Sequence, residues 1–218
     1  MSGLSDRLEL RRRIEARLHG SQPATDLTTA HAGGIAPEFS DRFRRFYPAS
    51  LAPAAVLVPI VDRDEGPTIL LTQRSAQLKN HAGQISFPGG RIESSDAGPL
   101  DAALRETEEE VGLMRDYIQV AGYLDPLVVL TGFCITPVVG FVNPGFTLKL
   151  NSREVETTFE LPLAHLLDEA NHLSRERVIG DVPVQVYDIP FGAYQIWGAT
   201  AGILMNLYRL LAAPPVNR

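Results

Sequence analysis

Four glutamates within five residues, at the end of a predicted helix, constrain the fold of this chain more than any other feature. The helix is indicated by an apolar stripe with three- and four-residue spacing, at Leu100, Ala103, Leu104, Thr107 and Val111. Gly112 then predicts the helix stop. The acidic run lies where the helix dipole and mutual repulsion both oppose negative charge, at Glu106, Glu108, Glu109 and Glu110. These residues alone leave two explanations open, a solvated surface face or a site for a divalent cation.

Composition limits the classes of protein to which the chain can belong. Its 218 residues are 44% hydrophobic, which suits one domain with an appendage. A net charge of −6 without a basic excess predicts no nucleic-acid partner. The lone Cys134 cannot form an intrachain disulfide and is expected to be a small core residue in a reducing compartment. The charged first 20 residues contain no apolar segment of a secretory signal, so we expect a cytoplasmic protein that does not associate with a membrane.

The order of predicted elements indicates an α/β (α+β) fold, with a mixed β-sheet sandwiched between helices. Helices and strands alternate without a regular βαβ rhythm. We divide the chain into an N-terminal helical extension and linker (1–48), a main domain (49–213) and a tail (214–218). Predicted helices cover 4–18, 100–111, the segment from Pro162 and 194–211, and predicted strands cover 54–61, 68–74, 84–87, 118–125, 127–142, 146–150, 155–162 and 184–190.

The acidic helix belongs to a longer motif, GGRIESSDAGPLDAALRETEEEVGL, at residues 89–113. This stretch resembles the Nudix box, G-x5-E-x7-R-E-U-x-E-E-x-G-U, where U is aliphatic. The matching positions are Gly90, Arg105, Glu106, Glu109, Glu110, Gly112 and Leu113. In this chain Asp96 takes the place of the first box glutamate, eight residues instead of seven separate it from Arg105, and Thr107 replaces an aliphatic residue. The resemblance favours the metal site over a solvated face and implies the Nudix fold.

A second resemblance narrows the family. Residues 70–90, LLTQRSAQLKNHAGQISFPGG, are similar to the segment that precedes the box in coenzyme A pyrophosphatases of the Nudix superfamily. Those enzymes also have a box loop that is one residue longer, and IWGATAGIL at residues 196–204 is similar to that group as well. The resemblance covers residues 50–210 of the chain, and the first 45 residues carry no diagnostic motif.

The resemblance implies a hydrolase that uses Mg²⁺ or Mn²⁺ to cleave the diphosphate of coenzyme A and its derivatives. The expected products are 3′,5′-ADP and 4′-phosphopantetheine or its acyl form. By resemblance Glu106, Glu109 and Glu110 hold the metal, and Arg105 orients a glutamate. One alternative is a Nudix pyrophosphatase for another nucleoside diphosphate derivative, such as ADP-ribose or NADH. A further alternative is a catalytically silent Nudix domain that senses a ligand. The resemblance leaves a homodimer open.

Other candidate site residues follow from the same segments. The general base is left open between the metal-binding Glu106 or Glu109 and a distant carboxylate, Glu154 or Glu156, which would share one face of a strand. The substrate-binding candidates are Arg74, His81, Gly89 and Gly90; the two glycines would allow a tight turn and close approach of a ligand to the backbone. Asp96, in the loop before the helix, is left open between a carboxylate of the site and an N-cap. We expect Trp197 to pack the last helix on the sheet instead of stacking on a nucleobase.

Overall fold

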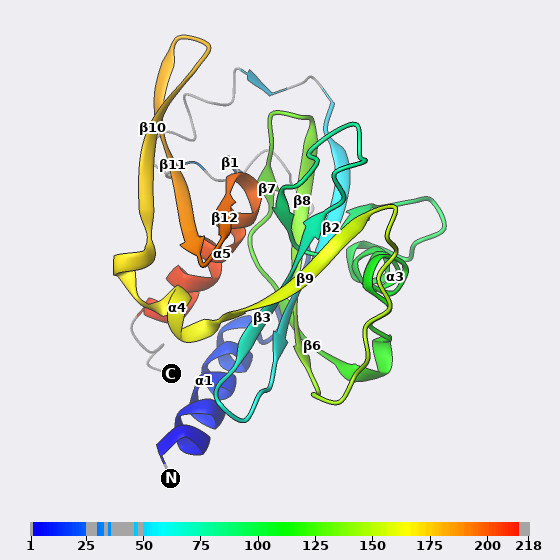
Figure 1. Ribbon diagram of the computed structural model, residues 1–218, viewed down its shortest axis with the longest axis vertical. Coiled ribbons are helices and arrows are strands. Elements are labelled where there is room, and N and C mark those ends of the chain that lie inside the picture. The colour runs from blue at the N-terminus through cyan, green and yellow to red at the C-terminus, as the bar shows by residue number, and fades with distance from the viewer. Residues whose placement is uncertain (1, 25–29, 33–34, 36–45, 48–49, 214–218) are drawn as a thin grey trace.

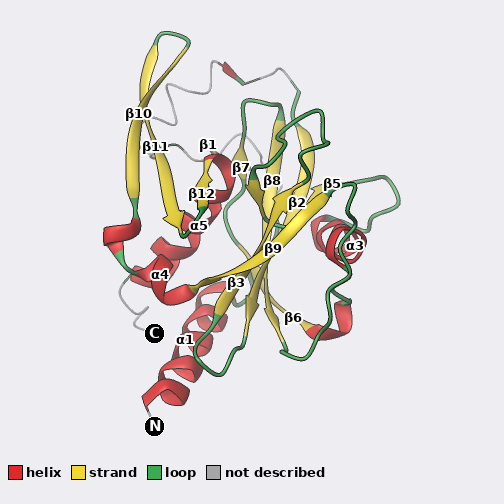
Figure 2. Ribbon diagram, in the orientation of Figure 1, coloured by secondary structure: helices red, strands yellow, loops and turns green. Residues whose placement is uncertain are grey.

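A mixed β-sheet separates two hydrophobic cores, with helix α3 on one face and helices α1 and α5 on the other (Figures 1 and 2). The computed structural model describes residues 2–24, 30–32, 35, 46–47 and 50–213. The predicted architecture, a mixed sheet sandwiched between helices, is confirmed. Within these residues the helices are α1 (Ser2–Leu18), α3 (Pro99–Val111), α4 (Leu163–Leu167) and α5 (Gly198–Ala212), with 3₁₀ turns at Arg115–Tyr117 and Glu169–Asn171.

Strands β2 and β8 form the centre of the main sheet. They run parallel over ten residue pairs, from Ala52 opposite Phe133 to Val61 opposite Val142. Both are nearly continuous apolar runs, as expected for strands covered on both faces. The described strands of this sheet are β1 (His31–Ala32), β2 (Ala52–Val61), β3 (Thr68–Arg74), β4 (Ile85–Ser86), β5 (Gly89–Arg91), β6 (Ile118–Tyr123), β7 (Leu127–Val128), β8 (Phe133–Val142) and β9 (Val155–Pro162).

A second, smaller sheet lies beside α5. It consists of β10 (Leu173–Ile179), β11 (Val182–Phe191) and β12 (Tyr194–Trp197), all antiparallel. The β10–β11 hairpin projects from the rest of the molecule (Figure 1). Strand β12 lies against β4, and the Thr200 hydroxyl donates a hydrogen bond to the Ile85 carbonyl at 2.8 Å. The smaller sheet is thereby fixed next to the strand that leads into the glycine pair at residues 89–90.

The N-terminal helix packs into the same core as the rest of the fold. Ile14 and Leu18 are buried against residues of the main sheet and α5. The side chains of Arg13 and Arg17 donate hydrogen bonds to the carbonyls of Leu211 and Ala213, so α1 satisfies carbonyl groups at the end of α5. The division of the chain at residue 48 stays a prediction, and most of the linker lies outside the described residues. No helix in the described ranges has the length and apolar character needed to span a bilayer.

Three sequence-based predictions about the second half of the chain are wrong. Residues 146–150 do not form a strand; the backbone N–H groups of Lys149 and Asn151 donate to the carbonyls of Val111 and Glu110 at 2.9 Å, at the end of α3. The predicted helix at 194–211 begins only at Gly198, because the four preceding residues pair with β11 as strand β12. Trp197 is 41% exposed, with the Arg177 guanidinium 5.7 Å from the centre of its ring, so it does not pack the helix on the sheet.

The turn between β2 and β3 is tied to β9 by a bidentate ion pair. The Arg63 guanidinium donates to both oxygens of Glu160, at 3.0 and 2.6 Å, and the Thr68 hydroxyl donates to the same carboxylate. The hydrogen bonds from Arg63 are the main reason that the pKa of Glu160 is lowered.

Replacing this carboxylate should lower stability in a pH-dependent way. We expect Glu160→Gln to reduce the free energy of unfolding by about 1 kcal/mol at pH 7, since the pair is partly exposed and screened by solvent. A carboxylate whose pKa is lowered by folding stabilises fully above the unfolded-state pKa, about 4.3, and the stabilisation disappears as the pH falls through the folded-state value. The difference from wild type in urea unfolding should therefore narrow below about pH 4. Glu156→Gln, on the exposed part of β9, is the control; a pH-independent difference for Glu160→Gln would contradict the ion-pair explanation.

Candidate active site

Helix α3 ends as the sequence predicts, and its end is held by a neighbouring segment. Gly112 has a left-handed backbone (φ 70°), and its N–H donates to the Glu108 carbonyl at 3.0 Å. A Cβ at this position would lie 2.9 Å from the backbone nitrogen of Lys149. The glycine therefore permits both the turn and the close approach of the segment whose N–H groups satisfy the last carbonyls of the helix.

Arg105 is the centre of an ion-pair network on one side of α3. Its guanidinium donates to both oxygens of Asp96 at 2.9 and 3.0 Å, to Glu106 at 2.9 Å and to Glu109 at 3.3 Å. These contacts raise the pKa of Arg105 well above its ordinary value, and the hydrogen bonds to Asp96 contribute most to the rise. Arg105 thus holds two of the three predicted metal ligands in place, as a residue that orients a glutamate would do.

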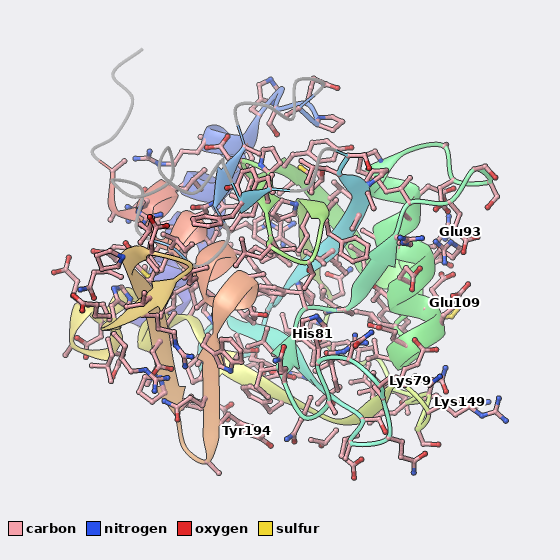
Figure 3. All side chains as sticks on the ribbon, turned by 90° about the horizontal axis from the view of Figure 1, so that it is seen from above. Lys79, His81, Glu93, Glu109, Lys149 and Tyr194 are labelled. Atoms are coloured by element: carbon pink, nitrogen blue, oxygen red, sulfur yellow. The ribbon has the colours of Figure 1, made fainter. Side chains whose placement is uncertain are left out.

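Asp96 is part of this network and does not cap the helix. In the described chain Gly98 precedes α3 without a side-chain cap, so the N-cap alternative for Asp96 is wrong. Its carboxylate instead accepts the Arg105 hydrogen bonds and one from the Glu93 N–H at 2.7 Å, and the pKa of Asp96 is lowered, chiefly by Arg105. In Figure 3, Glu93 and Glu109 lie on the same flank of α3. The loop before the helix is therefore fastened to it through Arg105.

Two glutamates of the cluster are turned toward the interior. Glu110 is 4% exposed, and burial raises its pKa to about 7, although the Gly89 N–H (3.2 Å) and the Arg74 charge oppose the rise. Burial also raises the pKa of Glu106 against the effect of Arg105. Glu154 adds to both shifts by charge repulsion. The cluster therefore holds more negative charge than its basic neighbours compensate.

Glu154 reaches this cluster from a turn, whereas Glu156 does not. Glu154 is half-buried just before β9, and its carboxylate accepts a hydrogen bond from the Asn151 side-chain amide at 2.8 Å. Glu156 is exposed at a β-bulge, where Gln73 pairs with Thr157 and the next residue of β3 pairs with Val155. The expected shared strand face is wrong, since one residue precedes the strand and the bulge interrupts the alternation.

The two glycines of β5 serve different purposes. Gly89 has φ 150°, and a Cβ there would lie 2.4 Å from the Ala55 carbonyl oxygen and 2.6 Å from the Val56 Cα. A Cβ at Gly90 would lie 2.4 Å from the carboxyl carbon of Glu106. Gly89 is thus needed where strand β5 pairs with β2, and Gly90 leaves the space that the Glu106 carboxylate occupies.

The predicted substrate-binding side chains lie on β3 and the loop that follows it. Arg74 ends β3, and its Nε is buried without a hydrogen-bond partner in the described structure. His81 is exposed and has a left-handed backbone (φ 59°), with its Nδ1 2.9 Å from the Gln84 side-chain oxygen. Figure 3 shows His81 and Lys79 on this loop. The Arg74 charge acts on Glu110 of the carboxylate cluster, whereas the His81 side chain forms a hydrogen bond within its own loop.

The donor chemistry of the cluster fits a hard divalent cation. Glu106, Glu109 and Glu110 carry the carboxylate oxygens that Mg²⁺ and Mn²⁺ prefer, and basic neighbours compensate only part of the charge at Glu106 and Glu110. Among the described residues, no group of three or more Asp, Glu, His or Cys side chains is already arranged to hold a metal ion. Two of the three glutamates, Glu106 and Glu109, pair with Arg105 in this structure.

Sequence reasoning did not identify Asn151, which holds Glu154 beside the helix. The signal available was an asparagine three residues before the glutamate, a spacing typical of side chains that organise a turn.

Comparisons with known proteins bear on the family and the fold. A family model described as a NUDIX domain matches residues 51–179. The uncharacterized Nudix hydrolase NudL of Escherichia coli (strain K12) is 42% identical over 167 residues, which cover 74% of this chain and 84% of that protein, and its namesake in Shigella boydii serotype 18 matches equally. The crystal structure of RenU, a Nudix hydrolase from M. Smegmatis, has a TM-score of 0.51 at 19% identity, covering 78% of this chain and 91% of that one, and supports the fold.

The glycine pair allows a test that separates the site from the fold. We expect Gly90→Ala to displace the flexible end of Glu106, and to weaken Mn²⁺ binding at least about tenfold while the thermal midpoint changes little, because the clash is with a side-chain end. Gly89→Ala meets backbone atoms in a left-handed conformation and should lower the free energy of unfolding by about 1–3 kcal/mol. Isothermal titration and thermal unfolding of both variants measure the two effects. Unchanged Mn²⁺ affinity in Gly90→Ala would contradict the role of this space.

Proposed function

The chain belongs to the Nudix family, and we propose that it is a metal-dependent pyrophosphatase for coenzyme A and its derivatives. The observation that carries the proposal is the cluster of partly buried, incompletely compensated carboxylates on α3, joined by Glu154 from the turn before β9. Such charge is unfavourable in an empty site and becomes favourable when a divalent cation is shared among the carboxylates.

Glu106, Glu109 and Glu110 would hold Mg²⁺ or Mn²⁺. When bound, the ion supplies positive charge that neutralises the diphosphate and makes an attacking water more acidic. Arg105 keeps the glutamates on one side of the helix, through contacts of 2.9 Å and 3.3 Å with Glu106 and Glu109. Its own position is fixed by two hydrogen bonds to Asp96, so it orients carboxylates and takes no direct part in the reaction.

Glu154 is the carboxylate that we assign as general base. Glu106 and Glu109 are ion-paired with Arg105, and one oxygen of Glu110 accepts the Gly89 N–H. Glu154 is held by a neutral amide, and its negative charge remains available. In the proposed step the water oxygen forms a bond to phosphorus, its proton passes to Glu154, and the bond from phosphorus to the bridging oxygen breaks.

The substrate class follows from the resemblance of residues 70–90 to coenzyme A pyrophosphatases. Within that segment, Arg74 has a buried Nε without a partner in the described residues and lies close enough to Glu110 for its charge to lower the pKa of that carboxyl. A guanidinium beside the metal site suits a diphosphate oxygen. His81 is assigned to the substrate or to the structure of the loop. The products would be 3′,5′-ADP and 4′-phosphopantetheine, or its acyl form.

A panel of diphosphate substrates tests this assignment. Purified protein with Mn²⁺ would be incubated with coenzyme A, dephospho-coenzyme A, ADP-ribose and NADH, and the products identified by mass spectrometry. Release of 3′,5′-ADP from coenzyme A is the expected result. Brisk cleavage of ADP-ribose or NADH without cleavage of coenzyme A would make the substrate class wrong. A folded protein that cleaves none of them would favour a ligand-sensing Nudix domain.

Removing one proposed ligand should abolish most of the activity without unfolding the protein. We expect Glu109→Gln to lower kcat by about 100-fold or more, the scale for losing a single electrostatic group at a reacting centre. The fold should persist, since the Glu109 side chain is 57% exposed. The control is Glu108→Gln on the same helix, because that carboxylate binds Arg115 outside the cluster. Steady-state kinetics with Mn²⁺ measure the effect, and a wild-type rate for Glu109→Gln would remove Glu109 from the site.

A further inference from the structure

Asn151 joins the end of the acidic helix to the turn that carries Glu154. Its backbone N–H donates to the Glu110 carbonyl at 2.9 Å, and its carbonyl accepts the N–H groups of Glu154 and Val155 at 2.9 and 2.8 Å. Its side-chain oxygen accepts the Arg153 N–H at 3.3 Å, and its side-chain amide donates to Oε1 of Glu154 at 2.8 Å. Asn151 therefore contacts both the end of α3 and the Glu154 carboxylate.

These contacts define where the Glu154 carboxylate lies. A glutamate side chain has several rotatable bonds, so a turn alone leaves its carboxylate free to sample many positions. The Ser75 N–H donates to the Glu154 carbonyl at 2.8 Å, which fixes the backbone from the β3 side. The Asn151 amide then fixes the carboxylate itself, at a place where its charge acts on both Glu106 and Glu110.

The chemistry of the amide matters as much as its position. A lysine or arginine at residue 151 would also hold the carboxylate, but it would neutralise the negative charge, as Arg105 does for Glu106. An asparagine donates one neutral hydrogen bond and leaves the carboxylate able to accept a proton. Glu154 is therefore oriented by a neutral donor, unlike Glu106 and Glu109, which pair with Arg105.

We propose that Asn151 is a positioning residue that acts through Glu154 in the hydrolysis. The inference rests on the proposed function, and it adds a residue whose side-chain amide contacts the proposed base. Asn151 places the base relative to the metal-binding helix, so its contribution falls on kcat and not on substrate affinity.

The test is a double-mutant cycle with Glu154. Asn151→Asp keeps the acceptor for the Arg153 N–H, removes the donor to Glu154 and adds a repelling charge. We expect kcat to fall by about 10- to 100-fold, with KM within about threefold, as for a misplaced catalytic group. Glu154→Gln should lower kcat by about 100-fold or more. In the double variant the base is already absent, so adding Asn151→Asp to Glu154→Gln should lower kcat by less than about twofold further.

Controls separate positioning from folding and from metal binding. Asn143→Asp, an exposed asparagine at the start of the same segment, should leave kcat within about twofold of wild type. Asn151→Ser lacks both the reach to Glu154 and the added charge, and should show the same loss of kcat if Asn151→Asp proves unstable in thermal unfolding. The Mn²⁺ dissociation constant, measured by electron paramagnetic resonance, should stay within about threefold, because the carboxylates proposed to hold the ion, on Glu106, Glu109 and Glu110, are unchanged.

Several results would overturn the inference. Action through Glu154 as the base would be excluded if the two losses of kcat multiply in the double variant. It would also be excluded if both Asn151 variants keep the wild-type kcat, or if Mn²⁺ affinity falls as much as kcat does. If wild type cleaves ADP-ribose instead of coenzyme A, the substrate assignment fails and the cycle is run on ADP-ribose. The absence of cleavage across the whole panel would overturn both proposals together, whereas normal wild-type cleavage with multiplying losses would overturn this inference alone.

Discussion

Burial of carboxylates at the negative end of a helix is the constraint on which the rest of this structure depends. Glu110 is almost completely enclosed, Glu106 is partly enclosed, and both are approached by Glu154, so desolvation and repulsion act in the same direction. A protein without a use for this arrangement would gain stability by replacing one of these residues with a neutral one. The positive charge of Arg105 and the Gly89 N–H offset only part of the cost. The geometry is understandable as a site that is completed by an ion from outside the chain.

The surrounding elements are arranged to permit this cluster. The Gly89–Gly90 strand lies close enough to α3 that any larger side chain at residue 90 would occupy the place of a carboxylate. The segment before β9 supplies N–H groups to the end of the helix, and it can lie so close because residue 112 is a glycine. These contacts hold β5, the end of α3 and the turn before β9 at distances that leave room for the glutamate side chains.

Local patterns predicted the parts of the fold that local interactions determine. The spacing of Leu100, Ala103 and Leu104 and the stop at Gly112 are properties of a single helix, and the structure has them where the sequence placed them. Strand β10 has almost no apolar periodicity and is held by its register with β11, so no window of sequence reveals it. The sequence from Asn151 to Glu154 indicates a turn, but the position of this turn beside Glu110 depends on how the sheet brings β9 to α3. The prediction for Trp197 was wrong because an apolar residue next to a helix favours burial, whereas here it ends strand β12 with its side chain 41% exposed.

The hydrogen bonds from Arg13 and Arg17 of α1 to the end of α5 have a consequence for synthesis on the ribosome. The guanidinium of Arg13 and its carbonyl acceptor are 198 positions apart in the chain, so α1 emerges long before the helix it binds. Until then Ile14 and Leu18 have no complete hydrophobic surface on which to dock. This part of the core therefore closes only after α5 has been synthesised, and it depends on contacts between residues far apart in the sequence.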